Sequence, residues 1–308
     1  MRFAIAHARA AAARFSALPG NVRGPLFLLV SGLVFAGMNV TIKLLGDRLG
    51  TGEIAFFRAL IGLMFYWPFI AFDLSALRTQ YPGTHAVRGF IGGFSMLLSF
   101  HALILLPMAD ATAYGFTRSL FLIVLAVLIL REPVRVRRLA ATIIGFIGVL
   151  IMLQPQGGLQ FAALIALSSA FINAWVVVLV KRLMAVEKPV TVLFYFGLST
   201  TLLTAVPAML DWQAPTAREW VLLVIMGFLG GAAQSLVIRA YRAAEATVLA
   251  PFDYVPLLYA TLLGYLFFAD LPTVWTVVGA AIIVAANLYI TYREHQLRLP
   301  PPPPEAPR

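Results

Sequence analysis

An internal repeat limits the fold of this chain more than any other feature. The segment Gly89–Gly93 (GFIGG) returns as Gly227–Gly231 (GFLGG), so the two copies are offset by 227 − 89 = 138 residues. Lys43 and Lys181 keep the same offset. Self-similarity at one long period predicts that a structural unit has been duplicated. In an apolar chain, such a duplication is typical of membrane bundles built from two related halves.

The composition assigns the chain to a membrane. Hydrophobic residues make up 61% of the 308 residues, charged residues only 12%, and the mean hydropathy is +0.90. Soluble domains carry about 25% charged residues, so lipid is the expected solvent. The net charge of +10 does not indicate a nucleic-acid partner, because the charges lie in short loops between apolar runs. The absence of cysteine excludes disulfides and thiol chemistry.

Ten segments are apolar enough to be membrane spans, which need about 20 residues each. Extended backbone would leave its polar groups unsatisfied in lipid, so we expect helices and an all-α polytopic membrane protein. The predicted spans are 26–46, 52–72, 87–106, 109–130, 138–153, 159–181, 189–210, 218–240, 245–268 and 273–292.

The distribution of basic residues predicts an orientation. With the N-terminus in the cytoplasm, only Arg48 and Arg218 of the 23 lysines and arginines fall in outer loops. Lys43, Arg58 and Arg118 fall inside spans, which leaves 18 on the cytoplasmic side. Cytoplasmic loops of inner-membrane proteins are enriched in this way. We therefore expect a bacterial inner-membrane protein with both termini in the cytoplasm.

Each repeat contains five spans, an odd number, so the two copies cross the membrane in opposite senses. The sequence thus predicts two inverted five-helix repeats, 25–155 and 156–293, with a site near the midplane between them. Residues 1–24 are predicted to form a cytoplasmic amphipathic tail rather than a secretory signal. Residues 294–308, with five consecutive prolines, are predicted to be a disordered cytoplasmic tail.

Each half also carries short motifs. They are Gly89–Gly93, Met108–Thr112 and Arg131-Glu132 in the first half, and Ala244–Thr247, Pro251, Asp270 and Gly279–Ala281 in the second. In these motifs, and over about residues 25–293, the chain resembles EamA-type proteins of the drug/metabolite transporter superfamily. The resemblance implies ten helices around a central cavity lined chiefly by spans 1, 3, 4, 6, 8 and 9. Relatives carry amino acids and their derivatives, often outward, or S-adenosylmethionine or riboflavin.

Two opposite charges stand at matched places inside the spans. Between Asp110–Thr112 and Glu245–Thr247 the offset is 135, and at that offset Arg118 aligns with Asp253. A charge at a span centre costs roughly 2.5–3.5 kcal/mol on insertion scales, so such residues usually face a cavity or a partner.

This pair has three interpretations. Arg118 would hold a carboxylate or phosphate while Asp253 holds an amine or exchanges a proton; alternatively the two form a structural ion pair, or an ion pair that opens when substrate binds. Pro251 and Pro256 remove helix hydrogen bonds around Asp253 and favour contact between its backbone and a ligand.

Other groups near these charges are also candidates. Tyr114 is four residues before Arg118, which predicts a shared helix face suited to a ring-bearing ligand; packing explains it equally well. Arg58, with Lys43 and Glu53, is interpreted as part of an outer-mouth cluster, with snorkelling and a local ion pair favoured over function.

Neutral polar residues within the spans complete the candidate substrate site. Asn39, Asn173 and Gln234 lie in spans that the resemblance assigns to the cavity, with hydrogen bonding between helices as the alternative. His101 is a candidate proton-sensitive group, although a packing role is favoured.

The glycine motifs have a separate predicted role. Gly89 and Gly93 are four residues apart, as are Gly227 and Gly231, and each pair lets another helix approach closely. We interpret these glycines as helix-packing seams rather than ligand contacts.

These observations predict a secondary transporter that works by alternating access. The first candidate substrate is a small zwitterionic metabolite, an amino acid or derivative, with export slightly favoured and protons as a candidate coupling ion. The alternative is uptake of a larger conjugated metabolite such as S-adenosylmethionine or riboflavin. An intramembrane enzyme is a third interpretation, but the sequence has no P-loop, no H-E-x-x-H motif and no paired catalytic groups, and neither a metal nor a cofactor is expected.

Overall fold

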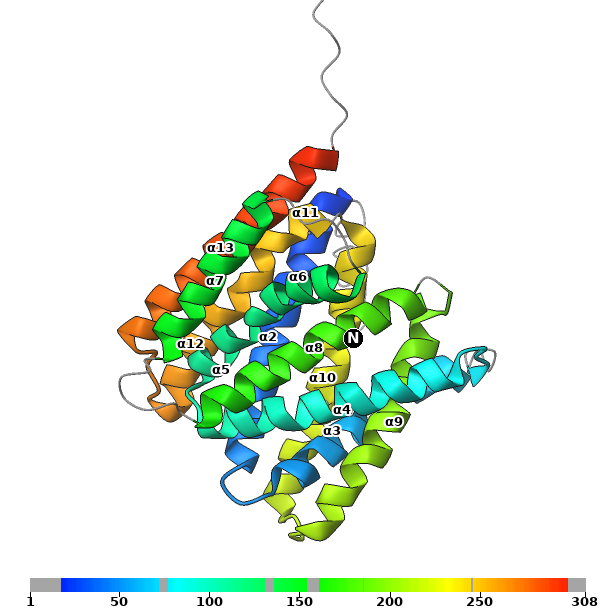
Figure 1. The fold of residues 1–308 in the computed structure, drawn as a ribbon. Coiled ribbons are helices and arrows are strands. Elements are labelled where there is room, and N and C mark those ends of the chain that lie inside the picture. Colours follow the sequence, from blue (N-terminus) through cyan, green and yellow to red (C-terminus); the bar gives the residue numbers. More distant parts are fainter. Residues whose placement is uncertain are drawn as a thin grey trace, which may run out of the picture.

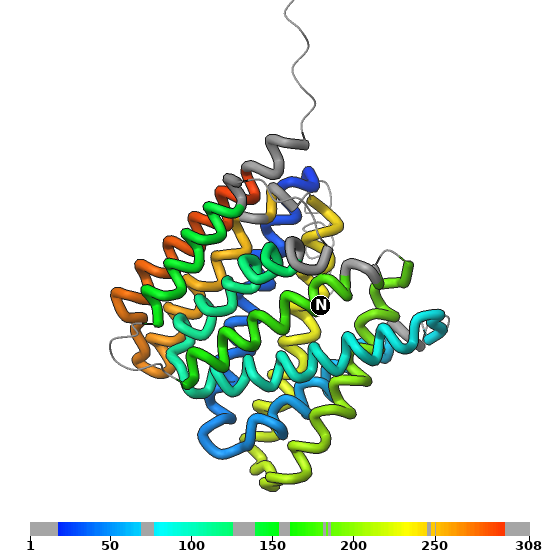
Figure 2. Tube along the Cα trace, viewed as in Figure 1, coloured from blue at the N-terminus to red at the C-terminus, as the bar shows by residue number. Residues whose placement is uncertain are grey.

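The structure, a computed structural model, describes residues 18–71, 77–130, 136–153, 161–184, 186–244 and 246–298, and these residues form a helical bundle without strands (Figures 1 and 2). The helices are α2 (Gly20–Leu45), α3 (Thr51–Ala71), α4 (Pro82–Leu105), α5 (Met108–Gly115), α6 (Thr117–Leu130), α7 (Val136–Leu153), α8 (Phe161–Met184), α9 (Pro189–Leu210), α10 (Ala217–Ala243), α11 (Ala246–Leu249), the 3-10 helix η3 (Ala250–Tyr254), α12 (Val255–Phe268) and α13 (Val274–Arg298).

Seven helical segments are long and apolar enough to cross a membrane: α2, α4, the part of α8 up to Val180, α9, α10, the segment Pro251–Phe268 and the part of α13 up to Tyr292. The helices coincide with the predicted spans to within a few residues. Two predicted spans are not single helices, however. The span 109–130 is divided into α5 and α6, and the span 245–268 into α11, η3 and α12.

The structure describes a few residues of each predicted tail. Helix α2 begins at Gly20 and α13 continues to Arg298, so the ends of both predicted tails are helical. The other tail residues, 1–17 and 299–308, lie outside the described residues.

The packing of the helices follows the repeat. Helix α2 packs on α10, and its equivalent α8 packs on α4. The contact of α3 with α10 likewise matches that of α9 with α4, and the contact of α2 with α12 matches that of α8 with α6. Two further pairs, α3 with α9 and α7 with α13, join helices that are each other's equivalents; α7 and α13 run side by side in Figure 1.

Two hydrogen bonds show the repeat at the level of single atoms. Ser31 in α2 donates from Oγ to the carbonyl of Ala233 at 2.9 Å, and Ser169 in α8 donates from Oγ to the carbonyl of Ser95 at 2.8 Å. Both the donors and the acceptors are 138 residues apart in the sequence. The sequence repeat is therefore also a repeat of side-chain contacts.

The glycine motifs lie where helices of the two repeats meet. A Cβ atom on Gly89 would lie 2.2 Å from the Cβ of Ser199 in α9, and one on Gly227 would lie 2.4 Å from Cγ2 of Ile61 in α3. Ser199 and Ile61 are themselves 138 residues apart. The second glycine of each pair shows the same relation, Gly93 with Leu203 and Gly231 with Phe65.

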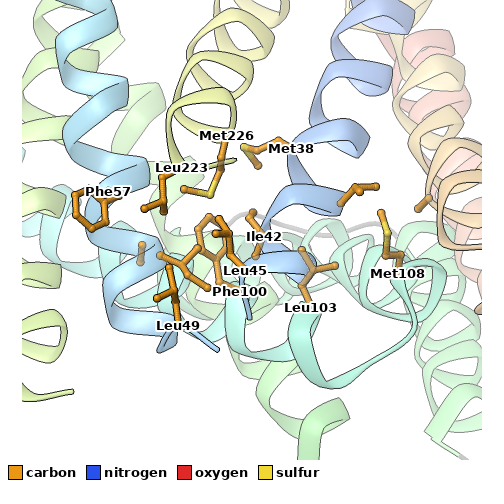
Figure 3. Close-up of a cluster of buried hydrophobic side chains, with 14 residues drawn as sticks. Met38, Ile42, Leu45, Leu49, Phe57, Phe100, Leu103, Met108, Leu223 and Met226 are labelled. Carbon is orange, nitrogen blue, oxygen red and sulfur yellow. The ribbon is translucent and has the colours of Figure 1, made fainter. Parts of the chain in front are cut away.

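One end of the bundle is closed by an apolar cluster. It joins α2, α3, α4 and α10, and Figure 3 shows that side chains from these helices point toward one another. Its labelled members are Met38, Ile42, Leu45, Leu49, Phe57, Phe100, Leu103, Met108, Leu223 and Met226. We call this end the sealed end.

Polar contacts between the repeats lie at the same end. Lys43, at the end of α2, donates from Nζ to Oδ2 of Asp270 at 2.5 Å and to the carbonyl of Leu106 at 2.9 Å. Its ammonium also lies 5.0 Å from the centre of the Phe268 ring. Lys43 thus joins the first repeat to the loop that follows α12.

Two further contacts lie nearby: one joins the loop before α3 to the first turn of α10, and the other joins the start of α3 to the loop between α9 and α10. Arg48 pairs with Glu219, and the carboxylate of Glu53 accepts from the backbone N–H of Gln213 at 3.2 Å. The predicted cluster of Lys43, Glu53 and Arg58 is therefore wrong, because Lys43 and Glu53 have other partners and Arg58 lies in the cavity described below.

Candidate functional site

A cavity of about 340 Å³ lies between the two repeats. A second cavity of about 190 Å³ adjoins it, and Arg118 and Asn173 line both. Among the described residues, the two linings come from α3, α4, α5, α6, α8, α9 and α10. The expectation that spans 1 and 9 line the cavity is not met, since α2 and α12 contribute no described lining residue; α3 and α9 do.

Residues that line the larger cavity are the repeat equivalents of residues buried in the sealed end. Ile42 and Met226 are fully buried in the apolar cluster. Their equivalents at the 138-residue offset, Val180 and Arg88, line the cavity. The same set of repeat positions is thus packed together at one end of the molecule and separated by a cavity at the other.

Arg118 reaches the cavity because its helix is broken just before it. Helix α5 ends at Gly115 and α6 begins at Thr117, which places Arg118 in the first turn of α6. Its Nη1 donates to Oδ1 of Asn173 at 3.4 Å, and Nδ2 of Asn173 donates to Oγ of Ser95 at 3.5 Å. Among the described residues, the hydrogen-bond acceptor of this cavity-facing guanidinium is thus a neutral amide at 3.4 Å.

Asp253 lies at the equivalent break, in the 3-10 helix η3. The hydroxyl of Tyr241 donates to its carboxylate, at 3.0 Å to Oδ2 and 3.3 Å to Oδ1. The charges of Asp253 and Arg118 interact electrostatically, but the two side chains do not form an ion pair. The interpretation of a purely structural bridge is thus wrong for this conformation, because each residue has a neutral partner.

Arg58 is a cavity residue that the sequence interpretation placed elsewhere. Its Nε donates to the sulfur of Met38 at 3.3 Å, and a Cβ atom on Gly230 would lie 2.2 Å from its Cζ. The absence of a side chain at Gly230 therefore leaves the space that this guanidinium fills, in the wall of the cavity between α3 and α10.

Arg88 is a second missed cavity residue, because the orientation analysis counted it among the cytoplasmic charges. It lies within α4 and only 7% of its surface is exposed. Its Nη1 donates to the carbonyl of Val192 at 3.2 Å, and its Cζ lies 4.3 Å from the centre of the Phe196 ring. Its Nε has no hydrogen-bond partner.

Four predicted site residues lie outside both linings: Asp253, described above, and Tyr114, His101 and Asn39; Asn173 lines both cavities and Gln234 the larger one. Tyr114 is buried, and its hydroxyl donates to the carbonyl of Met152 at 3.3 Å. It does not share a face with Arg118, because the helix is broken between them. His101 lies at the end of α4, with Nδ1 3.1 Å from Oγ1 of Thr51, and Asn39 is a half-buried residue of α2.

The cavity between the two repeats offers space for a small molecule. Among the described residues, no group of three or more His, Cys, Asp or Glu side chains could hold a metal ion. The cavity is lined by guanidinium and amide groups, which can bind a small molecule through hydrogen bonds. The fold and the site thus define a membrane carrier made of two repeats.

Comparison with known proteins identifies which carriers these are. The model of the EamA-like transporter family matches twice, at residues 22–154 and 160–292. The chain belongs to this family, whose members transport small metabolites across membranes. A solved crystal structure shares the fold, with a TM-score of 0.61 and 22% identity over 91% of this chain and 99% of that one.

Several curated relatives match over most of their length. The S-adenosylmethionine uptake transporter of Rickettsia prowazekii is 32% identical, covering 90% of this chain and 95% of the relative. The riboflavin transporter of Vibrio cholerae is 32% identical, covering 89% and 94%. The pseudopaline exporter of Pseudomonas aeruginosa is 28% identical, covering 87% and 95%.

Proposed function

We propose that this protein is a secondary carrier of the bacterial inner membrane that takes up a conjugated, ring-bearing metabolite by alternating access. Its ten spans would form two inverted five-helix repeats with both termini in the cytoplasm. The observation that carries the proposal is the cavity between the repeats. Residues that line it are the repeat equivalents of residues packed together in the sealed end.

Alternating access follows from the relation between the two ends. In an inverted repeat, exchanging the conformations of the two halves turns a structure open to one side into one open to the other. Two equivalent positions support this: Ile42 is fully buried in the sealed end, whereas Val180 lines the cavity. Under the proposed topology, Lys43 and the sealed end face outward, so the cavity faces the cytoplasm.

The substrate proposal departs from the first expectation, export of an amino acid. The relatives are named for S-adenosylmethionine, riboflavin and pseudopaline, all larger than a free amino acid, which supports the alternative. The two adjoining cavities, of about 340 and 190 Å³, are also of the size that drug-sized ligands occupy.

The test is counterflow in proteoliposomes that contain the purified protein. Labelled S-adenosylmethionine, riboflavin and free amino acids are each offered to vesicles loaded with the same unlabelled compound, with and without a proton gradient. We expect a conjugated compound to accumulate, and Asn173→Ala, in the lining, to reduce its rate. Asn39→Ala removes the same amide outside the lining and is the matched control.

Two results would contradict this proposal. If only free amino acids accumulate, the substrate is an amino acid, as first expected, and not a conjugated metabolite. Equal loss of counterflow in Asn173→Ala and Asn39→Ala would mean that transport does not depend specifically on the residues that line the cavity.

A further inference from the structure

The lining of the cavity is positively charged, and Asp253, the carboxylate whose charge interacts with that of Arg118, lies outside this lining. Arg58, Arg88 and Arg118 all line the cavity, and no Asp or Glu is among the described residues of its lining. We propose that this cavity binds an anionic group, a carboxylate or a phosphate, on the transported molecule. This inference deepens the proposed function and rests on it for the identification of the cavity as the transport site.

Arg58 carries the first part of the argument. An arginine inside a membrane bundle is costly unless its charge and its five N–H donors find partners. Among the described residues, the hydrogen-bond acceptor of Arg58 is a thioether sulfur, a weak acceptor, at 3.3 Å. No carboxylate of the described residues lies within 4.0 Å of it. Its charge is thus left for a partner that enters the cavity.

Arg88 carries the second part. It is more than nine-tenths buried, and its Nε–H has no acceptor although it is not in contact with solvent. A buried, unsatisfied donor on a charged group is destabilising. The guanidinium instead stacks on the ring of Phe196 and donates one hydrogen bond to the carbonyl of Val192. A planar anion would satisfy the remaining donors by paired hydrogen bonds.

The repeat shows that this charge belongs to one half only. The equivalents of Arg58 and Arg88 in the second repeat are Phe196 and Met226, which are uncharged. A basic residue is therefore not needed at either position to build the scaffold, because the second repeat builds the same contacts without one. Phe196 packs beside Gly92 in the same way that its equivalent, Arg58, packs beside Gly230.

The surroundings of the charges suit a ring as well as an anion. Phe196 and Tyr66 line the same cavity as the three arginines. A conjugated ring can stack on these side chains and on guanidinium planes while its acidic group binds the N–H donors. The inference thus selects, among conjugated metabolites, those with a net negative charge, and disfavours a net cation, which three like charges repel.

The experiment compares pairs of probes that differ only in the anion. Riboflavin 5′-phosphate is paired with riboflavin, and N-acetyltryptophan with N-acetyltryptophanamide. Binding to the purified protein is measured by the rise in unfolding temperature at constant ionic strength, because a ligand that binds only the folded state stabilises it. We expect the anionic member of at least one pair to raise this temperature clearly more than its neutral partner does; the pair that responds distinguishes phosphate from carboxylate.

Variants locate the effect. Arg58→Gln, Arg88→Gln and Arg118→Gln should each weaken binding of the anionic probe roughly tenfold or more. Arg218→Gln loses the same charge at an exposed position of α10 and should bind as the parent does. Without probe, the Arg58 and Arg88 variants should unfold at or above the parent temperature, whereas a merely structural role predicts a decrease.

The outcomes separate the two proposals. Equal binding of both members of each pair, or an equal loss of binding in Arg218→Gln, overturns the anion site. Selective anion binding that the cavity variants abolish establishes the site even if no compound shows counterflow, in which case the proposed transport function fails and the anion site stands.

Discussion

The two repeats build the same contacts and different chemistry. Ser31 and Ser169 make equivalent hydrogen bonds, and Gly89 and Gly227 lie against equivalent neighbours. At the cavity, however, the first repeat supplies three arginines; at the 138-residue offset the second repeat has the uncharged residues Phe196, Met226 and Pro256.

The difference indicates which positions are free to vary. Contacts that hold helices together are kept in both copies, because each copy must build the same bundle. Side chains that face the cavity differ, because a single asymmetric substrate meets both halves at once. Comparing the repeats within one chain therefore separates scaffold from site.

The largest expected effect comes from placing a large side chain at the glycines where helices of the two repeats pack closely. Gly89→Leu and Gly227→Leu should each destabilise the protein by about 3 kcal/mol and abolish counterflow, because both force helices apart where a Cβ already overlaps a neighbour. Thermal unfolding and elution volume measure the loss. Gly83→Leu, at a position where a Cβ meets nothing within 4 Å, is the control. A much smaller loss at one of the two seam positions would show that the repeats are not equivalent scaffolds.

The next effect comes from making the first repeat resemble the second at the cavity. Arg58→Phe copies the residue found at the equivalent position, and it removes a charge that lacks a carboxylate partner. We expect the free energy of unfolding of the empty protein to rise by about 1–3 kcal/mol and transport to fall. Chemical unfolding and counterflow measure the two changes, and a fall in stability would show that Arg58 holds the scaffold.

A third prediction concerns the two ends. The chain contains no cysteine, so a single introduced thiol reports on its own position. Val180→Cys, in the cavity, should react with a water-soluble maleimide about tenfold faster or more than Ile42→Cys, at the equivalent position of the sealed end. Mass spectrometry of the labelled protein measures the ratio. Equal rates would mean that the ends do not differ in access.

The smallest effect is expected from the contacts that tie the sealed end. Asp270→Asn removes the carboxylate that accepts from Lys43 in a partly buried pair, and should weaken closure by about 1 kcal/mol. Labelling of Ile42→Cys should then become several-fold faster. Arg48→Gln removes an exposed pair with Glu219 and should change labelling little. If both variants change the labelling rate equally, the pair of Lys43 and Asp270 does not contribute more to closure than the exposed pair does.

Much of the scaffold could be predicted from the sequence, because helix positions depend on apolar runs and the repeat register depends on sequence identity. The break in span 109–130 was not predicted. Pro251 and Pro256 mark the second break, but Gly115 alone is a weak signal, since a single glycine is often tolerated within a helix. This missed break explains why Tyr114 was placed on the face of Arg118.

The site was harder to predict for a physical reason. Arg58 and Arg88 were placed by their distance from the end of a span, which gives depth but not direction. Direction depends on the neighbouring helices, and the glycine that makes room for Arg58 is Gly230, far away in the sequence. A usable signal was present all the same: both arginines align with uncharged residues in the other repeat.

The equivalence of Arg88 and Met226 has a consequence for the kinetics of the carrier. If the second repeat closes as the first has closed, Arg88 moves from the wall of the cavity, where 7% of it is exposed, to the setting that Met226 has now, at 0% exposure in an apolar cluster. A bare guanidinium resists such burial far more than one paired with an anion. The empty carrier would then return slowly and the loaded carrier quickly, so that exchange of one substrate molecule for another outpaces net flux.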